Sequence, residues 1–449
     1  MNKNFVSFNL FSQYYFYVSP SNDKAKPSPE EKGMSSDEAL NQIFKKFKVI
    51  SYRQSFPNAK NIELQNFYEI HLSEKVNIDS FENLLKSQKS FDAIYRSDYY
   101  VPACDNPVSI NDAWIVNNLI NNDALDLLNT QCAWTITKGN SDIIVAVIDT
   151  EFETIHEDMI NTFVSTVGTQ TYPMNHGTSV SSCVATGTNN NKGIAGIGYN
   201  TRVKGYHADG GTLWNSIWQA YQDGIKIINV SWSGEGSHPN LLAVQEMTNN
   251  GVVLTFAAGN NPTAVGHSAY ANVPGAINVS GVLANNHHNG TNRAHNQWVD
   301  VCTLFENVAL CQRGNTYIVR GGTSFAAPQV AGVVALIRSI NSSLSPAEIE
   351  NIIKSTTDPI ADGHLFPGQL GTGRVNAYNA VQAACATVSP VNNFTNKIVT
   401  TNTTVKSCDD INVQNVTISN NAKLKLETPA EVTINGDFEV QSGSELEIK

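Results

Sequence analysis

The feature that most constrains the fold is the run Ile143-Ile144-Val145-Ala146-Val147-Ile148, which is followed directly by Asp149. Six consecutive apolar and mostly β-branched residues predict a strand that is buried on both faces, as in a parallel sheet. Further strand candidates lie at 203–208, 225–230, 252–256, 276–282 and 298–302. Helical patterns separate several of these strands, notably at 212–223 and 241–249. The alternation predicts an α/β domain with a doubly wound parallel sheet.

Four polar residues fall at the ends of these elements. Asp149 ends the first strand, and open α/β sheets place their active-site groups at the carboxyl ends of strands. His176 opens a small-residue helical run, and Asn260 follows the strand at 252–256. Ser324 precedes an apolar helical run, and the backbone N–H groups at a helix start can stabilise an oxyanion.

These four side chains are the ones that serine-based amide hydrolysis requires. A serine hydroxyl needs a histidine to take its proton, and a buried carboxylate orients and stabilises that imidazole. An amide side chain and a backbone N–H can stabilise the oxyanion. Each residue alone has a structural interpretation, as a strand-end cap, a structural histidine, a turn residue or a helix N-cap. Their joint occurrence favours a catalytic site.

The segments that contain these residues resemble the subtilisin-like serine proteases, or subtilases, over roughly residues 111–385. The matching motifs are Val147–Thr150, His176–Thr178, Asn229–Gly234, Ala258–Asn260 and Gly322–Pro328. The resemblance implies a subtilisin-like catalytic domain and a serine endopeptidase that acts on protein or peptide substrates. It implies no cofactor for catalysis.

The resemblance also implies a role for each residue. Ser324 would be the nucleophile, His176 the general base and then acid, and Asp149 the residue that orients His176. Asn260 would donate to the oxyanion. The substrate-binding residues that it implies, which border the cleft or line the pocket before the scissile bond, are Ser231, Trp232, Ser233, Ala257, Ala258 and Gly259.

The sequence departs from the family pattern at two positions. Glu151 follows Asp149-Thr150, where the family usually has glycine, and Ser179 follows His176-Gly177-Thr178, where a second histidine is frequent. Neither change removes a catalytic atom. Glu151 would bring a carboxylate near the cleft and favour basic substrate side chains, or it would be a solvated loop acid.

Two rival interpretations remain open. A sedolisin-type peptidase shares the Gly-Thr-Ser motif, but it uses Glu in place of His and Asp at the oxyanion position, so His176 and Asn260 argue against it. The other rival is a binding or adhesion protein with a catalytically silent protease fold. Labelling of Ser324 by a fluorophosphonate separates this rival from an active enzyme.

The chain divides into four predicted parts. Residues 1–46 are expected to be a leader or linker, with an apolar stretch that resembles the end of a signal peptide. Residues 47–105 predict a small α/β unit in the position of the family's propeptide, as in a zymogen. Residues 106–386 form the catalytic domain. Residues 387–449 alternate with period 2 and repeat at a 22-residue offset, which predicts an all-β module of stacked rungs or a small β-sandwich.

The composition bounds the partners. The net charge is −11, and no basic patch appears, so nucleic acid is not an expected partner. No run of 18 apolar residues appears, so no membrane span is expected. The family resemblance predicts a secreted protein, and the C-terminal module would bind substrate or a cell surface, or would cover the core.

Cysteines and metal ligands give fewer constraints. Of seven cysteines, Cys302 and Cys311 are expected to form one disulfide, and Cys385 and Cys408 a second that attaches the C-terminal module to the core. His287-His288 is interpreted as part of a solvated loop, because no partner stands at ligand spacing. Calcium is common in the family, but no oxygen-rich loop indicates ligands, so no metal-binding residue is predicted.

Overall fold

The computed structural model of the protein describes residues 14–28, 34–55, 64–72, 78–98, 104, 107–114, 123–169, 175–234, 236–264, 268–291, 293–388, 391–408, 410–428 and 431–448. The chain forms two compact units, residues 1–105 and 106–449. Each unit has a hydrophobic core of its own.

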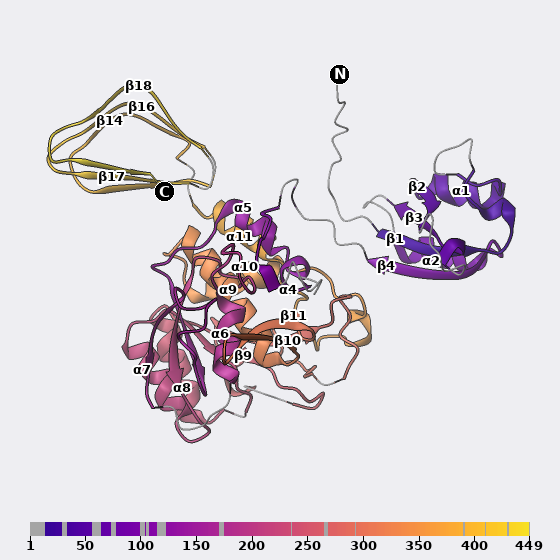
Figure 1. Cartoon of the computed structure of the whole chain (residues 1–449), viewed down its shortest axis with the longest axis horizontal. Helices are drawn as coiled ribbons and strands as arrows, with labels where there is room; N and C mark the ends of the chain where they lie inside the picture. The colour runs from indigo at the N-terminus through magenta and orange to yellow at the C-terminus, as the bar shows by residue number, and fades with distance from the viewer. Residues whose placement is uncertain are drawn as a thin grey trace. The chain divides into compact units, whose positions relative to one another are not determined.

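The N-terminal unit is a four-stranded antiparallel sheet with two helices (Figure 1). Its elements are β1 (Tyr14–Pro20), α1 (Glu38–Lys46), β2 (Val49–Gln54), β3 (Tyr68–Leu72), α2 (Ile78–Ser87) and β4 (Phe91–Asp98). The sheet order β2-β3-β1-β4 and the β-α-β-β-α-β sequence of elements are those of a ferredoxin-like fold. The N-terminal unit is therefore a complete α/β layer structure.

This unit corrects one predicted boundary. The sequence predicts residues 1–46 as a leader or linker, but β1 is a central strand between β3 and β4, and α1 packs into the same core. Phe16 and Val18 of β1 are fully buried, and an apolar alternation this short does not identify a strand in isolation. The predicted signal-like stretch up to Gln13 lies outside the described residues.

The second unit is built on a seven-stranded parallel sheet, which confirms the predicted fold class (Figure 1). The strand order is β11-β10-β9-β8-β5-β7-β6. The strands are β5 (Ile144–Asp149), β6 (Phe163–Val167), β7 (Arg202–His207), β8 (Ile227–Val230), β9 (Val253–Ala257), β10 (Ala276–Val282) and β11 (Val301–Leu304). Only β6 was not predicted. It is an edge strand with a largely exposed centre and therefore lacks a continuous apolar run.

Helices cover both faces of this sheet, with α7 and α8 on one side and α6 and α9 on the other (Figure 1). In the described part of this unit, the helices with given bounds are α4 (Asp123–Leu127), α5 (Thr130–Ile136), α6 (His176–Val184), α7 (Leu213–Gln222), α8 (His238–Asn249), α9 (Thr323–Ile340), α10 (Pro346–Ser355) and α11 (Ala377–Ala386). Within the described residues, α9 alone is long and apolar enough to cross a membrane, but it is the buried core helix of this unit.

A β-hairpin precedes α9 and was not predicted. Its strands are β12 (Val308–Gln312) and β13 (Thr316–Arg320), joined by a three-residue loop. The Gly314-Asn315 pair between two alternating runs is the sequence signal that could have identified it. The hairpin leads within a few residues to the start of α9, so it bears directly on the position of Ser324.

The cysteines agree with one predicted disulfide and correct the other. Cys385 and Cys408 are bonded, with their Cα atoms 5.8 Å apart. Cys302 and Cys311 are free buried thiols, as is Cys183. Cys302 lies in β11 within the parallel sheet, whereas Cys311 lies in β12 and packs against α6, so the fold assigns the two residues to different elements.

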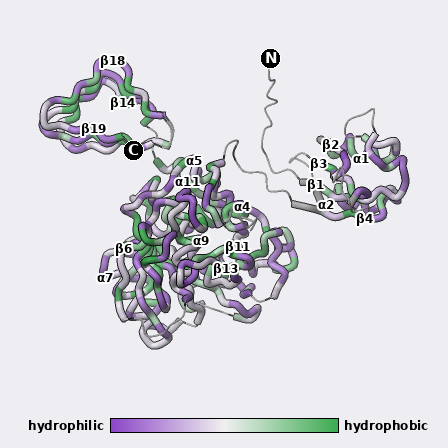
Figure 2. Tube along the Cα trace, viewed as in Figure 1, coloured by the Kyte–Doolittle hydropathy of each residue, from purple (hydrophilic) through white to green (hydrophobic). Residues whose placement is uncertain are grey.

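The C-terminal module consists of stacked β rungs, which resolves the alternative left open by its repeat. The strands β14 (Asn393–Val399), β16 (Ile411–Ile418) and β18 (Val432–Val440) pair in parallel on one side. The strands β15 (Thr403–Lys406), β17 (Lys423–Glu427) and β19 (Glu445–Ile448) pair in parallel on the other. Hydrophobic and hydrophilic residues alternate along these strands (Figure 2), and the apolar set forms the module's core.

Candidate active site

Asp149 lies at the carboxyl end of β5, and its side chain is fully buried. Its Oδ1 atom accepts the Thr150 backbone N–H at 2.7 Å and the Thr150 hydroxyl at 3.2 Å. The sequence forces this position, because an apolar strand buried on both faces carries the carboxylate that follows it to the sheet edge. The result is a carboxylate with a fixed orientation.

His176 is the first residue of α6 and lies directly beside Asp149. Its Nδ1 atom is 2.9 Å from Oδ1 and 2.9 Å from Oδ2 of that carboxylate. Burial of the imidazole lowers its pKa, but the charge of Asp149 and this hydrogen bond outweigh burial and raise the pKa above the ordinary value. Arg320 acts in the opposite direction on the same pKa.

Gly177 explains how α6 comes so close to the Asp149 strand. A Cβ atom at this position would lie 2.6 Å from the Glu151 carbonyl oxygen and 3.1 Å from Cβ of Asp149. The Thr178 backbone N–H donates to that same Glu151 carbonyl at 3.0 Å. The absence of a side chain at Gly177 therefore permits the contact between imidazole and carboxylate.

Ser324 is the second residue of α9, after the N-cap residue Gly322. The φ angle of Gly322 is 153°, in the region that favours glycine. Asn260 follows β9 and accepts the Thr323 backbone N–H at 2.8 Å and the Thr323 hydroxyl at 3.0 Å. Both bonds use the amide oxygen of Asn260, so its amide nitrogen is the group that remains to donate. His176 is nearby, because its ring centroid is 5.4 Å from that of Phe325.

Ser231 has a role that sequence reasoning did not assign. In a helix, the Ser324 carbonyl would accept the N–H of the residue four positions later, but that residue is Pro328, which has none. The Ser231 hydroxyl supplies the missing bond and donates to this carbonyl at 2.7 Å. Asn229 donates to Ser231 at 2.9 Å and accepts the Thr255 hydroxyl at 3.0 Å, so a buried network holds the Ser324 backbone.

The other predicted substrate residues are divided between interior and surface. Ala257 and Ala258 are buried, whereas Ser233 is exposed and Trp232 packs in part against the sheet core. Gly259 donates its N–H to the Thr323 hydroxyl at 3.1 Å, which joins this segment to the start of α9. The segment after β8 and the segment after β9 thus both contact the turn that carries Ser324.

Glu151 is neither a free subsite acid nor a solvated loop acid, so both predicted interpretations are wrong. Its residue exposure is only 4%, and Oε1 lies 2.7 Å from an Nη atom of Arg313 at the tip of the β12–β13 hairpin. Two neighbouring hydrogen bonds also join the hairpin tip to this loop: the Gly314 N–H donates to Glu153, and the Glu157 N–H donates to the side chain of Asn315. The Glu151 carboxylate therefore links the loop after Asp149 to the β12–β13 hairpin through its ion pair with Arg313.

Buried carboxylates also occur away from Asp149, His176 and Ser324. The described residues contain no group of three or more His, Cys, Asp or Glu side chains that could hold a metal ion. Two buried carboxylates, Asp112 and Asp158, do flank one loop, through bonds from Asn189 and Ile194. Burial raises the pKa of both, and the Asp158 charge contributes to raising that of Asp112 to about 6. Carboxylate oxygens are the type of ligand that Ca²⁺ prefers.

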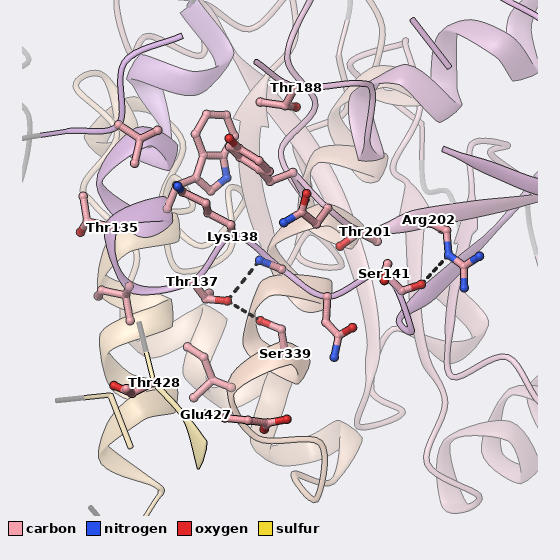
Figure 3. A pocket seen from close by; sticks show the side chains of 18 of the residues that line it. Thr135, Thr137, Lys138, Ser141, Thr188, Thr201, Arg202, Ser339, Glu427 and Thr428 are labelled. Carbon is pink, nitrogen blue, oxygen red and sulfur yellow. Dashed lines mark hydrogen bonds between the residues drawn. The ribbon is translucent and has the colours of Figure 1, made fainter. Parts of the chain in front are cut away.

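A well-defined cavity lies apart from these residues. It has a volume of about 880 Å³, and the loop after α5 and the end of α9 form part of its wall (Figure 3). In that wall the Thr137 hydroxyl bonds that of Ser339 at 2.8 Å and accepts the Gly139 N–H at 3.1 Å. None of the predicted catalytic residues lines this cavity, so its size does not identify it as the active site.

Comparisons with known proteins agree with the geometry. A model of the Subtilase family matches residues 140–378. The chain is 36% identical over 271 residues to a thermophilic serine proteinase of Bacillus sp. strain AK1, covering 56% of this chain and 65% of that protein. It is 32% identical to thermitase of Thermoactinomyces vulgaris, covering 56% of this chain and 92% of thermitase. A solved protease of Pseudoalteromonas arctica aligns with a TM-score of 0.51 at 25% identity, covering 62% of this chain and all of that one.

Proposed function

This chain belongs to the subtilase family, and we propose that it is a secreted serine endopeptidase that cleaves proteins through an acyl-enzyme on Ser324. The observation that carries the proposal is the pair of 2.9 Å contacts between His176 and Asp149 at the start of α6. The His176 ring also packs near Phe325, the residue that follows Ser324. A raised imidazole pKa makes His176 a stronger base than free histidine.

In the proposed reaction, Ser324 Oγ attacks the scissile carbonyl carbon while His176 takes the hydroxyl proton. Asp149 holds the imidazole and stabilises its positive charge. The Asn260 amide and the backbone N–H of Ser324 donate to the oxyanion. The carbon–nitrogen bond then breaks, and His176 gives the proton to the leaving amine. Water attacks the acyl-enzyme by the same route in reverse and releases the acid product.

The test is activity on an unfolded protein substrate combined with covalent labelling. Ser324→Ala and His176→Ala should each lower kcat by on the order of 10⁶, and Asn260→Ala by about 10²–10³; both magnitudes are those known for subtilisin. A fluorophosphonate should label the wild type and not Ser324→Ala. The mechanism is falsified if Ser324→Ala cleaves as fast as the wild type, and a wild type that is neither active nor labelled would be a silent scaffold.

We further propose that the N-terminal unit is a propeptide and that the protein is exported. The unit has its own core and lies before the family match, which suits a part that is removed after folding. The Cys385–Cys408 disulfide suits an oxidising compartment. Sequencing the N-terminus of protein from culture medium should place the first residue after β4. An unprocessed N-terminus on active enzyme would refute the propeptide assignment.

We also propose that Asp112, Asp158 and the 187–194 loop hold a structural Ca²⁺ ion. The ion would neutralise the paired carboxylates and would take no part in the chemistry. Chelation should then lower the thermal midpoint of the wild type more than that of Asp158→Asn. Equal shifts in the two proteins would rule this site out.

A further inference from the structure

Arg320 is an exposed cation immediately before the catalytic serine turn. It is the last residue of β13, and only Gly321 to Thr323 separate it from Ser324. Its backbone position is fixed by the register of the hairpin, in which Arg320 lies opposite Val308. The paired strands of the hairpin thus fix where the Arg320 backbone lies relative to the turn that contains Ser324.

The hairpin lies on the His176 side of Ser324. Its strand β12 is bonded to α6, the helix that His176 begins, because the Ser179 hydroxyl donates to the Cys311 carbonyl at 2.8 Å. The Cys311 N–H in turn donates to the Ser182 hydroxyl at 3.1 Å. The charge of Arg320 is close enough to His176 to lower the imidazole pKa.

Two carboxylates near the hairpin are already paired with other cations. Glu306, whose side chain runs beside Gly321, binds the buried guanidinium of Arg293 at 3.1 Å. Glu151 binds Arg313 at the opposite end of the hairpin. Among the described residues, Arg320 has no ion pair. The two arginines of the hairpin therefore differ: Arg313 is paired with a carboxylate within the fold, whereas Arg320 is exposed.

The proton that His176 releases goes to the leaving amine, so the leaving group must lie on the His176 side of Ser324. The residues that follow the scissile bond extend from that amine, and so from the side of Ser324 on which β12 is bonded to α6. We propose that Arg320 selects substrates with an acidic side chain at the first or second residue after the scissile bond. This inference rests on the proposed function and adds to it a chemical preference.

The experiment uses quenched-fluorescence peptides that are identical before the scissile bond and carry Asp, Asn or Lys at the first or the second position after it. Wild-type kcat/KM should favour Asp over Asn by about 2- to 5-fold at one of these positions, as expected for an ion pair with an exposed guanidinium. Lys should be the poorest residue, and high salt should reduce the preference.

Three substitutions isolate the charge. Arg320→Gln should reduce the Asp-to-Asn ratio to about 1, Arg320→Lys should retain part of it, and Arg320→Glu should favour Lys. Lys397→Gln, which removes an exposed cation from β14 in the C-terminal module, should leave the ratio unchanged.

Two results would overturn the inference while leaving the proposed function intact: cleavage of all peptides without a charge preference, or a preference that survives in Arg320→Gln. A wild type that cleaves none of the peptides and resists fluorophosphonate labelling would overturn the proposed function, and the inference with it.

Discussion

Replacing Ser231 with alanine should destabilise the start of α9, because Pro328 leaves the Ser324 carbonyl without a donor inside the helix. The substitution would leave two groups unpaired, the Ser324 carbonyl and the Asn229 amide that donates to Ser231. A buried group left unpaired costs about 1–3 kcal/mol. Since water can reach the half-buried Ser324, we expect a loss of about 2 kcal/mol in the free energy of unfolding.

Urea unfolding measures this loss in a background that carries Ser324→Ala, which prevents self-digestion. The substitution keeps the backbone carbonyl of residue 324, so the bond from Ser231 is retained. Pro328→Ala restores the missing N–H, so Ser231→Ala should cost about 1 kcal/mol less in that background. Ser233→Ala, at an exposed position of the same segment, should change the free energy by less than about 0.5 kcal/mol. The reasoning is refuted if Ser231→Ala has the same effect with and without Pro328.

Three further predictions concern pH, the hairpin and the disulfide. Cleavage should be lost as the pH falls through the raised pKa of His176, because the imidazolium cannot accept the serine proton. In a profile of kcat/KM against pH, Arg320→Gln should move this acidic limb to higher pH, because the charge of Arg320 lowers the pKa of His176. A shift to lower pH would contradict the assigned charge effect. Arg313→Gln should lower the free energy of unfolding by about 1 kcal/mol, since the Arg313 side chain is 56% exposed, and Glu151→Gln should leave any substrate charge preference intact, as measured with the same peptides. Reduction of Cys385–Cys408, which joins residues 23 apart, should destabilise the C-terminal module by about 3 kcal/mol, measured by thermal unfolding. The initial cleavage rate should stay the same. A parallel loss of activity would show that the module supports the core.

The sequence by itself determined the elements whose burial is uniform or strictly periodic. The apolar run before Asp149 predicted β5, and Ser345 with Glu348 marked the capping box that begins α10. The period-2 repeat after residue 387 predicted an all-β module, because alternate residues of its strands are buried, but it left stacked rungs and a β-sandwich both possible. The polar residues at strand and helix ends then predicted which edge of the sheet holds the candidate site, since parallel strands present their carboxyl ends at one edge.

Only the tertiary structure decided which distant groups pair. Glu151 is bound by Arg313, Ser231 replaces the donor that Pro328 removes, and Cys302 and Cys311 lie in separate elements. The amphipathic pattern of β1 is too short to identify it as a strand. Its place in the fold follows from its pairing with β3 on one edge and β4 on the other. Local periodicity reports the face that a residue buries, but the partner of a buried charge or carbonyl depends on which segments the folded chain brings together.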